Sequence, residues 1–266
     1  LVMIILSSYL VSPSMKNSFV VDDSENYSDA SGSSISEAIG FQEGFEGSKI
    51  SVGQDHVCWI AQEQSVNCKG GNFYGQLGTK GSGISFFSIE TGEFGNFASL
   101  SSGYRHTCSI SERSLAICWG HDSFGQSSGK IENEFFSPPS VIGIGGEAAI
   151  SSSSGKFHSC ALTLAGSVWC WGNFGDNPLN SQQNPPLPPT KIIDGRSEKA
   201  ISISSGKHHA CSILSDRTVR CWGDNSHNQV SEENIDYSPP LPNETHVFGR
   251  ILAISLGEYY TCALTF

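Results

Sequence analysis

Four histidine–cysteine sets with one spacing are the residues of this chain best suited to chemistry. In each set a histidine stands two positions before a cysteine, and a second cysteine follows ten positions later. The sets are His56/Cys58/Cys68, His106/Cys108/Cys118, His158/Cys160/Cys170 and His209/Cys211/Cys221. Histidine and cysteine bind zinc, but structural zinc motifs usually hold cysteine pairs separated by only about two to four residues. A fifth copy has Tyr260 at the histidine position. We therefore expect no metal and no cofactor at these sets.

Nucleophilic catalysis is the second chemistry that cysteine and histidine could perform. It needs one particular pair, set apart from the rest of the chain, in which a base activates the thiol. Here every such pair is a copy of a repeat. The sequence also lacks a Gly-x-Ser-x-Gly elbow, a P-loop and a dinucleotide-binding fingerprint. We predict no catalytic residue, and we expect that the protein is not an enzyme.

The spacing of the cysteines is better explained by a β-hairpin. Residues alternate between the two cysteines, as in "CALTLAGSVWCW" (160–171), and polar or small residues stand at the centre. A turn centred five residues after the first cysteine places both cysteines opposite each other, with Cα atoms about 4.5–5.5 Å apart. We predict four disulfides, each stabilising its hairpin by about 2.5–3 kcal/mol. They are Cys58–Cys68, Cys108–Cys118, Cys160–Cys170 and Cys211–Cys221.

The cysteine sets define a repeat that organises most of the chain. First cysteines stand at 58, 108, 160, 211 and 262, so the period is 50 to 52 residues. Such a period is typical of a solenoid, a propeller or an array of small domains. We assign the repeats to 49–98, 99–150, 151–201 and 202–252, with a partial copy at 253–266. Cys262 has no partner in that partial copy.

Other repeated residues are expected to be structural. Trp119, Trp171 and Trp222 each follow a second cysteine and are interpreted as packing residues between neighbouring units. The four histidines are interpreted as half-buried groups that bond to the backbone near an inner turn. Proline-rich stretches such as "FSPPSVI" recur in phase with the repeat. They are interpreted as connectors into the next unit, with recognition by SH3 or WW domains as the alternative.

Residues before the repeats have a different composition. The apolar stretch at the start of residues 1–14 suits a partial signal peptide, with a buried strand as the alternative. Residues 15–48 are rich in serine and acidic residues and are predicted to be a flexible lead-in. Two sequons, at Asn26 and Asn243, are compatible with glycosylation in a secretory pathway.

Charge and hydropathy exclude two classes of partner. The formal net charge is −11, and lysine and arginine are scattered, whereas nucleic-acid binding requires a basic patch. No apolar run approaches the roughly 20 residues of a membrane-spanning helix. We therefore expect neither nucleic-acid binding nor membrane insertion by this segment.

Together these residues carry a family resemblance. The pattern Gly-x-x-His-(Thr/Ser/Ala)-Cys, a hairpin, Cys-Trp-Gly-x-(Asn/Asp) and Gly-Gln resembles the repeat of the regulator of chromosome condensation (RCC1) family. It is most similar to the cysteine-paired variant found in secreted or cell-surface proteins, which includes the crinkly-type ectodomains of receptor kinases. The resemblance covers residues 49–266. It implies an all-β propeller of about seven blades, of which about four to five lie in this chain.

The resemblance leaves the function open between two classes. We expect an extracellular or cell-surface propeller that recognises a protein or peptide ligand, such as a receptor ectodomain, because paired cysteines suit an oxidising compartment. The alternative is an intracellular exchange factor or scaffold for a small GTPase. The segments that differ most between repeats are 77–99, 127–148, 176–198 and 229–250. A ligand surface is expected there.

Overall fold

The structure is a computed structural model that describes residues 3–6, 49–81, 83–89, 94–131, 134–175, 186–231, 237–245 and 250–266. The chain divides into two units, one of residues 8–46 and one of residues 1–7 with 47–266. Everything below concerns the second unit. The predicted lead-in 15–48 and the sequon at Asn26 lie outside the described residues.

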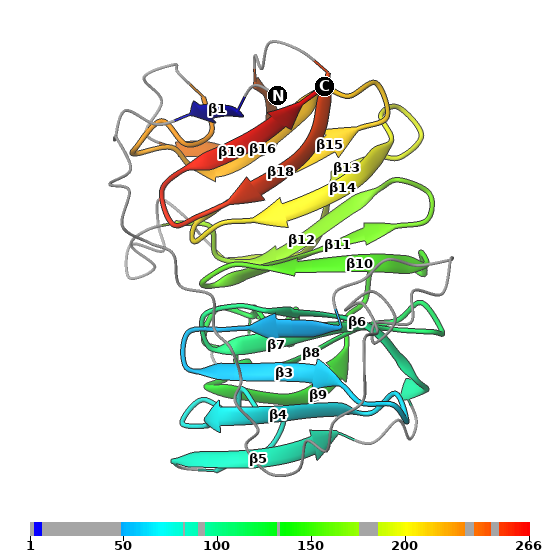
Figure 1. The fold of residues 1–266 in the computed structure, drawn as a ribbon, viewed down its shortest axis with the longest axis vertical. Helices are drawn as coiled ribbons and strands as arrows, with labels where there is room; N and C mark the ends of the chain where they lie inside the picture. Colours follow the sequence, from blue (N-terminus) through cyan, green and yellow to red (C-terminus); the bar gives the residue numbers. More distant parts are fainter. Residues whose placement is uncertain are drawn as a thin grey trace, which may run out of the picture. The chain divides into compact units, whose positions relative to one another are not determined.

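Four sheets of four antiparallel strands follow one another along the chain (Figure 1). The first two consist of β2 (Ile50–Val52), β3 (His56–Ile60), β4 (Val66–Gly71) and β5 (Ile84–Ile89), then β6 (Phe97–Ser102), β7 (His106–Ser111), β8 (Ala116–His121) and β9 (Phe136–Val141). The next two consist of β10 (Ala149–Ser154), β11 (His158–Thr163), β12 (Val168–Gly172) and β13 (Leu187–Ile193), then β14 (Ala200–Ser205), β15 (His209–Leu214), β16 (Val219–Asp224) and β17 (Tyr237–Thr245). Each sheet is one blade, which confirms the predicted all-β propeller architecture.

The first strand of each later blade begins near an expected repeat boundary. The first strands of blades two to five begin at residues 97, 149, 200 and 251, two residues before the boundaries at 99, 151, 202 and 253. The reason is a register irregularity near the start of each first strand, where one residue is skipped in the pairing with the second strand. Because of this extra residue, the first strand begins before the serine-rich run of its repeat.

Each pair of cysteines lies at one register position between the second and third strands of its blade. Cys58 faces Cys68, Cys108 faces Cys118, Cys160 faces Cys170 and Cys211 faces Cys221. All four pairs form disulfides with Cα atoms 4.1 Å apart. Since all eight sulfur-bearing side chains are fully buried, each bridge lies within the core of its blade.

A fifth sheet has strands from both ends of the chain. β18 (Ile251–Leu256) and β19 (Thr261–Thr265) form its first hairpin, and β1 (Met3–Leu6) pairs antiparallel with β19. Ile5 faces Cys262, so β1 occupies the place of the third strand, and Ile5 takes the register position of a second cysteine. Cys262 is accordingly a free cysteine. The described part of residues 1–14 is thus a strand, and the signal-peptide interpretation stays a prediction.

The proline-rich stretches were interpreted wrongly as connectors. They form the fourth strands β9, β13 and β17, each at the edge of its sheet. Proline cannot donate a backbone hydrogen bond, so it is confined largely to edge strands and bulges. An outermost strand pairs on one side alone, which makes these prolines compatible with the sheet.

Serine side chains join the first strands of neighbouring blades. The amide of Ser102 donates to the hydroxyl of Ser51 at 2.7 Å, the amide of Ser154 to Ser101 at 2.7 Å, and the amide of Ser205 to Ser153 at 2.8 Å. These bonds satisfy backbone donors that a first strand, lacking a neighbour strand on that side, would otherwise leave unpaired. They explain the recurrent serine runs that open each repeat.

Candidate functional site

Three of the four repeated histidines bond to the next blade, whereas the sequence interpretation expected bonds to the backbone near an inner turn. The Nε2 atom of His56 lies 2.8 Å from the hydroxyl of Thr107, and that of His106 lies 2.8 Å from the hydroxyl of Ser159. His209 makes the same contact with Thr261 at 3.0 Å. The hydroxyl always belongs to the residue before the first cysteine of the following blade. The histidines are buried, not half-buried as expected.

The hydrogen bonds of the hydroxyl determine which ring nitrogen of the histidine carries the proton. Thr107 and Ser159 donate their protons to the backbone carbonyls of Gln76 and Gln126, at 3.3 and 2.9 Å. Because a hydroxyl has one proton, it must accept at its other contact, so Nε2 of the histidine carries the proton. Burial lowers the pKa of His56 to about 4 and that of His106 to about 3, so both rings are neutral near pH 7.

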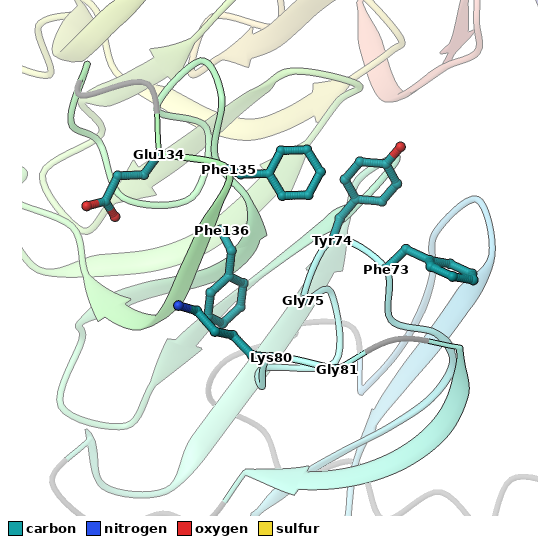
Figure 2. Close-up of a pocket in the computed structure, with 8 residues that line it drawn as sticks. All are labelled: Phe73, Tyr74, Gly75, Lys80, Gly81, Glu134, Phe135 and Phe136. Carbon is teal, nitrogen blue, oxygen red and sulfur yellow. The ribbon is translucent and has the colours of Figure 1, made fainter.

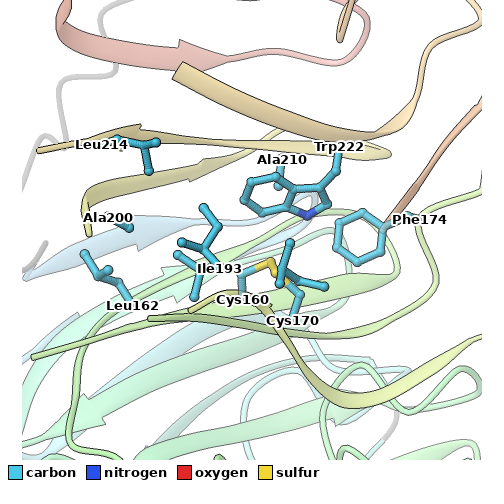
Figure 3. Close-up of a cluster of buried hydrophobic side chains, with 11 residues drawn as sticks. Cys160, Leu162, Cys170, Phe174, Ile193, Ala200, Ala210, Leu214 and Trp222 are labelled. Carbon is cyan, nitrogen blue, oxygen red and sulfur yellow. A yellow bond between two sulfur atoms is a disulfide. The ribbon is translucent and has the colours of Figure 1, made fainter. Parts of the chain in front are cut away.

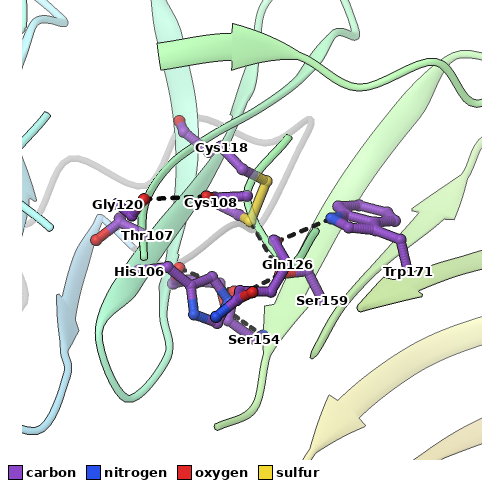
Figure 4. Close-up of a disulfide and its surroundings, with 12 residues drawn as sticks. His106, Thr107, Cys108, Cys118, Gly120, Gln126, Ser154, Ser159 and Trp171 are labelled. Atoms are coloured by element: carbon purple, nitrogen blue, oxygen red, sulfur yellow. Dashed lines mark hydrogen bonds between the residues drawn. A yellow bond between two sulfur atoms is a disulfide. The ribbon is translucent and has the colours of Figure 1, made fainter. Parts of the chain in front are cut away.

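Tryptophans complete the first two junctions. Trp119 packs in one buried cluster with the disulfide of blade one, and Trp171 packs with that of blade two. Their indole N–H groups donate to the same glutamine carbonyls, Gln76 and Gln126, at 3.0 Å. Figure 4 shows the second junction, where His106, Ser159 and Trp171 meet around Gln126 beside the Cys108–Cys118 bridge.

The junction between blades three and four lacks these bonds. Ala210 stands where blades two, three and five have threonine or serine, and the third repeat has no Gly-Gln at the usual place. Among the described residues, neither ring nitrogen of His158 has a hydrogen-bond partner, and the indole N–H of Trp222 has none. His158 instead stacks on Phe174, with ring centroids 3.9 Å apart. Phe174 also lies beside Trp222 in the buried cluster of Figure 3.

Two glycines per repeat are required by this close packing. Gly120 has φ +107°, and a Cβ there would lie 2.8 Å from the Cα of His106. A Cβ on Gly103 would lie 2.4 Å from both the His106 ring and the carbonyl oxygen of Gly155 in the next blade. These contacts explain why glycine precedes each histidine by three positions and follows each tryptophan.

The turns between first and second strands line a shared hollow of about 410 Å³. Every blade contributes the same three consecutive positions. They are Val52–Gln54, Ser102–Tyr104, Ser154–Lys156, Ser205–Lys207 and Leu256–Glu258. We call this the turn hollow. Backbone hydrogen bonds connect the turns of neighbouring blades. The amide of Tyr104 donates to the carbonyl of Gly155 at 3.1 Å, and the amide of Lys156 donates to the carbonyl of Lys207 at 2.9 Å.

A second hollow of about 470 Å³ lies between loops of the first two blades, and we call it the aromatic pocket. It is lined by Phe73, Tyr74, Gly75, Lys80, Gly81, Glu134, Phe135 and Phe136. Figure 2 shows four aromatic rings, with Lys80 and Glu134 beside them. Phe73 and Phe135 are 62% and 57% exposed, so both rings are available to a partner.

Aromatic and cationic side chains alternate between the two hollows. The guanidinium of Arg105 lies 4.0 Å from the ring centroid of Tyr74 and 5.1 Å from that of Tyr104. The ammonium of Lys156 lies 5.5 Å from the Tyr104 centroid and 4.8 Å from that of Phe157. We call Tyr74, Tyr104, Arg105, Lys156 and Phe157 the aromatic–cationic row. Cations over aromatic faces are attracted by the ring quadrupole, which orders these long side chains.

His121 packs against Tyr74, at one end of the aromatic–cationic row. Its ring contacts Tyr74 and Phe135 edge-on at centroid distances of 5.1 and 5.5 Å. Burial, assisted by the positive charge of Arg105, lowers the pKa of His121 to about 4. His121 is therefore a neutral part of the aromatic packing near pH 7.

Only part of this surface was foreseen in the sequence. Lys80 and Phe135 belong to the variable segments 77–99 and 127–148, where a ligand surface was expected. The turn hollow and most of the row lie instead inside the repeated Gly-x-x-His turn. The signal was present in the two variable positions of that turn, which read Tyr-Arg, Lys-Phe and Lys-His in blades two to four.

The paired cysteines, the four histidines and the three repeated tryptophans are all buried. The eight paired cysteines are disulfide-bonded and offer no thiolate. Within the described residues, no group of three or more His, Cys, Asp or Glu is arranged to hold a metal ion. The described part also contains no helix long and apolar enough to cross a membrane. Asn243 lies on β17, opposite Cys221 in register.

Comparison with known proteins agrees with this geometry. Residues 150–177 and 200–229 match the family model of the regulator of chromosome condensation (RCC1) repeat. Mouse Alsin is 28% identical over 138 residues, which are 48% of this chain and 8% of Alsin. The chain therefore spans a small part of this relative's length.

Two solved structures share the fold. Prp20p of Saccharomyces cerevisiae superposes with a TM-score of 0.66 and 19% identity, over 80% of this chain and 54% of that one. The ectodomain of the Physcomitrella patens receptor kinase CR4 has a TM-score of 0.51 and 20% identity, over 81% and 48%.

Blades of four antiparallel strands, joined by repeated interblade bonds, define a protein of the β-propeller class. Within that class, residues 150–177 and 200–229 match the RCC1 repeat, and the hairpins of this chain contain cysteine pairs.

Proposed function

We propose that this chain is a secreted or cell-surface recognition module that binds a protein or peptide partner and is not catalytic. The observation that carries the proposal is the buried disulfide in each of four hairpins, at one register position. Structural disulfides persist in oxidising compartments and are rare in the cytosol and nucleus. The exposed aromatic rings and cations beside the hollows supply a recognition surface of the kind that protein interfaces use.

The proposal is tested by counting free thiols in protein purified without reductant from its native host. Alkylation followed by mass spectrometry should modify one cysteine, Cys262. Glycan at Asn243, detected by enzymatic deglycosylation, would place the chain in the secretory pathway independently. Alkylation of all nine cysteines would overturn the extracellular assignment.

An intracellular exchange factor or scaffold is the second candidate. It is favoured by the likeness to Prp20p, whose structure was described together with its binding to Gsp1p and histones. Its distinguishing prediction is reduced cysteines together with binding to a small GTPase. Full-length protein that retains a nucleotide-free GTPase on a column, with all nine thiols free, would support this candidate instead of the first.

A further inference from the structure

We propose that the aromatic–cationic row and the aromatic pocket form one docking surface for an acidic peptide segment with an aromatic or aliphatic anchor residue. The inference rests on the proposed function, because it names the chemistry of the partner. Tyr74 joins the two features, since its ring is a wall of the pocket and also contacts Arg105 at 4.0 Å.

The charge distribution selects an acidic partner. The chain has 26 acidic and 15 basic residues, yet the turns of blades two, three and four carry Arg105, Lys156 and Lys207. Acidic residues take the turn in the flanking blades, at Asp55 and Glu258. Lys207 is bonded to Glu258, whereas Arg105 and Lys156 lie over the aromatic rings of the row. A local field opposite to the net charge steers a complementary ligand to this place.

The aromatic residues select a peptide with an anchor. Phe73 and Phe135 expose more than half of their surfaces at the aromatic pocket, and Tyr74 and Phe136 complete its walls. Exposed aromatic rings that border a hollow are enriched at protein interfaces, where a buried anchor supplies most of the binding energy. The pocket of about 470 Å³ has room for one large side chain.

Single-stranded nucleic acid also binds alternating aromatic and basic residues. It fits this surface less well, because a long polyanion needs cations along its whole length and the row offers two, Arg105 and Lys156. Glu134 borders the pocket, where it would repel a phosphate backbone but not the uncharged anchor residue of a peptide. Binding of a nucleic acid in preference to peptide would therefore overturn the proposal.

The test measures fluorescence anisotropy of labelled probes with the full chain. The first probe is a short run of glutamates with one central phenylalanine; the others are the same peptide with lysine in place of glutamate, and an oligothymidylate. The glutamate peptide should bind, its affinity should fall with added salt, and the lysine peptide should not bind. Equal binding of both peptides, or stronger binding of the oligothymidylate, would overturn the inference.

Variants locate the binding. Lys156→Glu reverses a charge in the row, and Phe135→Ser removes an exposed wall of the pocket. Each should weaken binding of the glutamate peptide about tenfold. Arg196→Glu is the matched control: Arg196 is exposed, and its turn bonds the hairpin turn at Ser167, at the opposite end of the blade. It should leave the affinity unchanged.

The outcomes separate this inference from the proposed function. Lys156→Gln, which removes the charge with little steric change, should give an intermediate loss, and melting curves verify that each variant is folded. If Lys156→Glu weakens binding no more than Arg196→Glu does, the docking surface is wrong. Since the thiol count does not depend on the probes, the proposed compartment stands or fails by itself.

Discussion

At the scale of single residues, a short polar chain recurs at the junctions of this propeller. A histidine of one blade, a hydroxyl of the next and a glutamine carbonyl of the first share their hydrogen bonds, with a tryptophan indole as the fourth member where one is present. Each group is buried, so a missing member leaves its partners without bonds in an environment without water. A buried unpaired polar group costs about 1–3 kcal/mol. The junction of blades three and four has this defect, at His158 and Trp222.

Restoring the missing hydroxyl should stabilise the protein. Ala210→Ser places an oxygen where Ser159 and Thr107 stand in the preceding blades, within reach of Nε2 of His158. We expect the free energy of unfolding to rise by about 1 kcal/mol in chemical denaturation.

The opposite change is the matched control. Thr107→Ala removes a hydroxyl that bonds both His56 and Gln76, and it should lower the free energy of unfolding by about 1–3 kcal/mol. A destabilised Ala210→Ser variant would show that the defect is filled in another way.

The buried histidines should make stability depend on pH. Burial lowers the pKa of His106 and His209 to about 3, against 6.5 for the unfolded chain. Their stabilising contribution is therefore complete above pH 6.5 and is lost as the pH falls from there towards 3. Each should reduce the free energy of unfolding by about 1 kcal/mol per pH unit in that window.

Urea denaturation at a series of pH values measures this dependence. The His106→Gln variant should show a shallower slope than the parent, because one titrating group is gone. Gln54→Asn, which changes an exposed residue without a titratable group, should keep the parent slope. Identical slopes for all three proteins would contradict a neutral buried His106.

At the scale of elements, the disulfide-linked hairpin is the unit that is copied. Its bridge lies in the core, where the tryptophan of the next blade packs against it in blades one to three. A bridge therefore has two effects, since it closes the hairpin and forms part of the neighbour's packing surface. The edge strands have another role, because prolines there limit further pairing at the rim of each sheet.

Removing one bridge should reveal both effects. The double variant Cys108→Ala/Cys118→Ala loses the closed loop of blade two and also the sulfur atoms of the buried cluster that contains Trp171. We expect a loss of about 2.5–3 kcal/mol from the loop, with a further loss from the cavity beside Trp171.

Removal of the blade-four bridge provides the comparison, because no tryptophan lies in the cluster around Cys211 and Cys221. Its loss should be smaller. Equal losses at the two sites, measured by chemical denaturation, would show that packing on the bridge contributes nothing.

At the scale of the whole described unit, the two ends of the chain meet in the fifth sheet. β1 pairs with β19 as the third strand of this sheet. Ile5 lies opposite Cys262, and Leu6 occupies the register position that tryptophan holds in other blades. Pairing of a terminal strand covers the edge of β19, whose backbone groups would otherwise be exposed for aggregation.

An engineered fifth bridge tests this pairing. Ile5→Cys places a thiol opposite Cys262, in the register of the four natural bridges. The oxidised variant should contain no alkylatable cysteine, whereas the parent has Cys262 free.

The neighbouring substitution Ile4→Cys is the control, because Ile4 faces Ala263 and successive side chains of a strand point to opposite faces. It should leave two free thiols. Two free thiols in Ile5→Cys as well would mean that β1 does not pair with β19 in this register.

Much of the architecture could be predicted from the sequence for a physical reason. A hairpin is local, so the spacing of Cys108 and Cys118 sets their register without knowledge of the rest of the fold. A period of 50 to 52 residues likewise predicts repeated blades, because each copy must bury its apolar face against the next. The free Cys262 also follows from the sequence count.

The tertiary structure decided what depends on contacts between copies. The partner of His106 is Ser159, 53 residues away, and no local rule relates them. The proline stretches became strands because the third strand of each blade offers an unpaired edge, a condition that exists only after the blade forms. The docking surface arises in the same way, since Tyr74, Arg105 and Lys156 come from three repeats and become neighbours only when the blades stack.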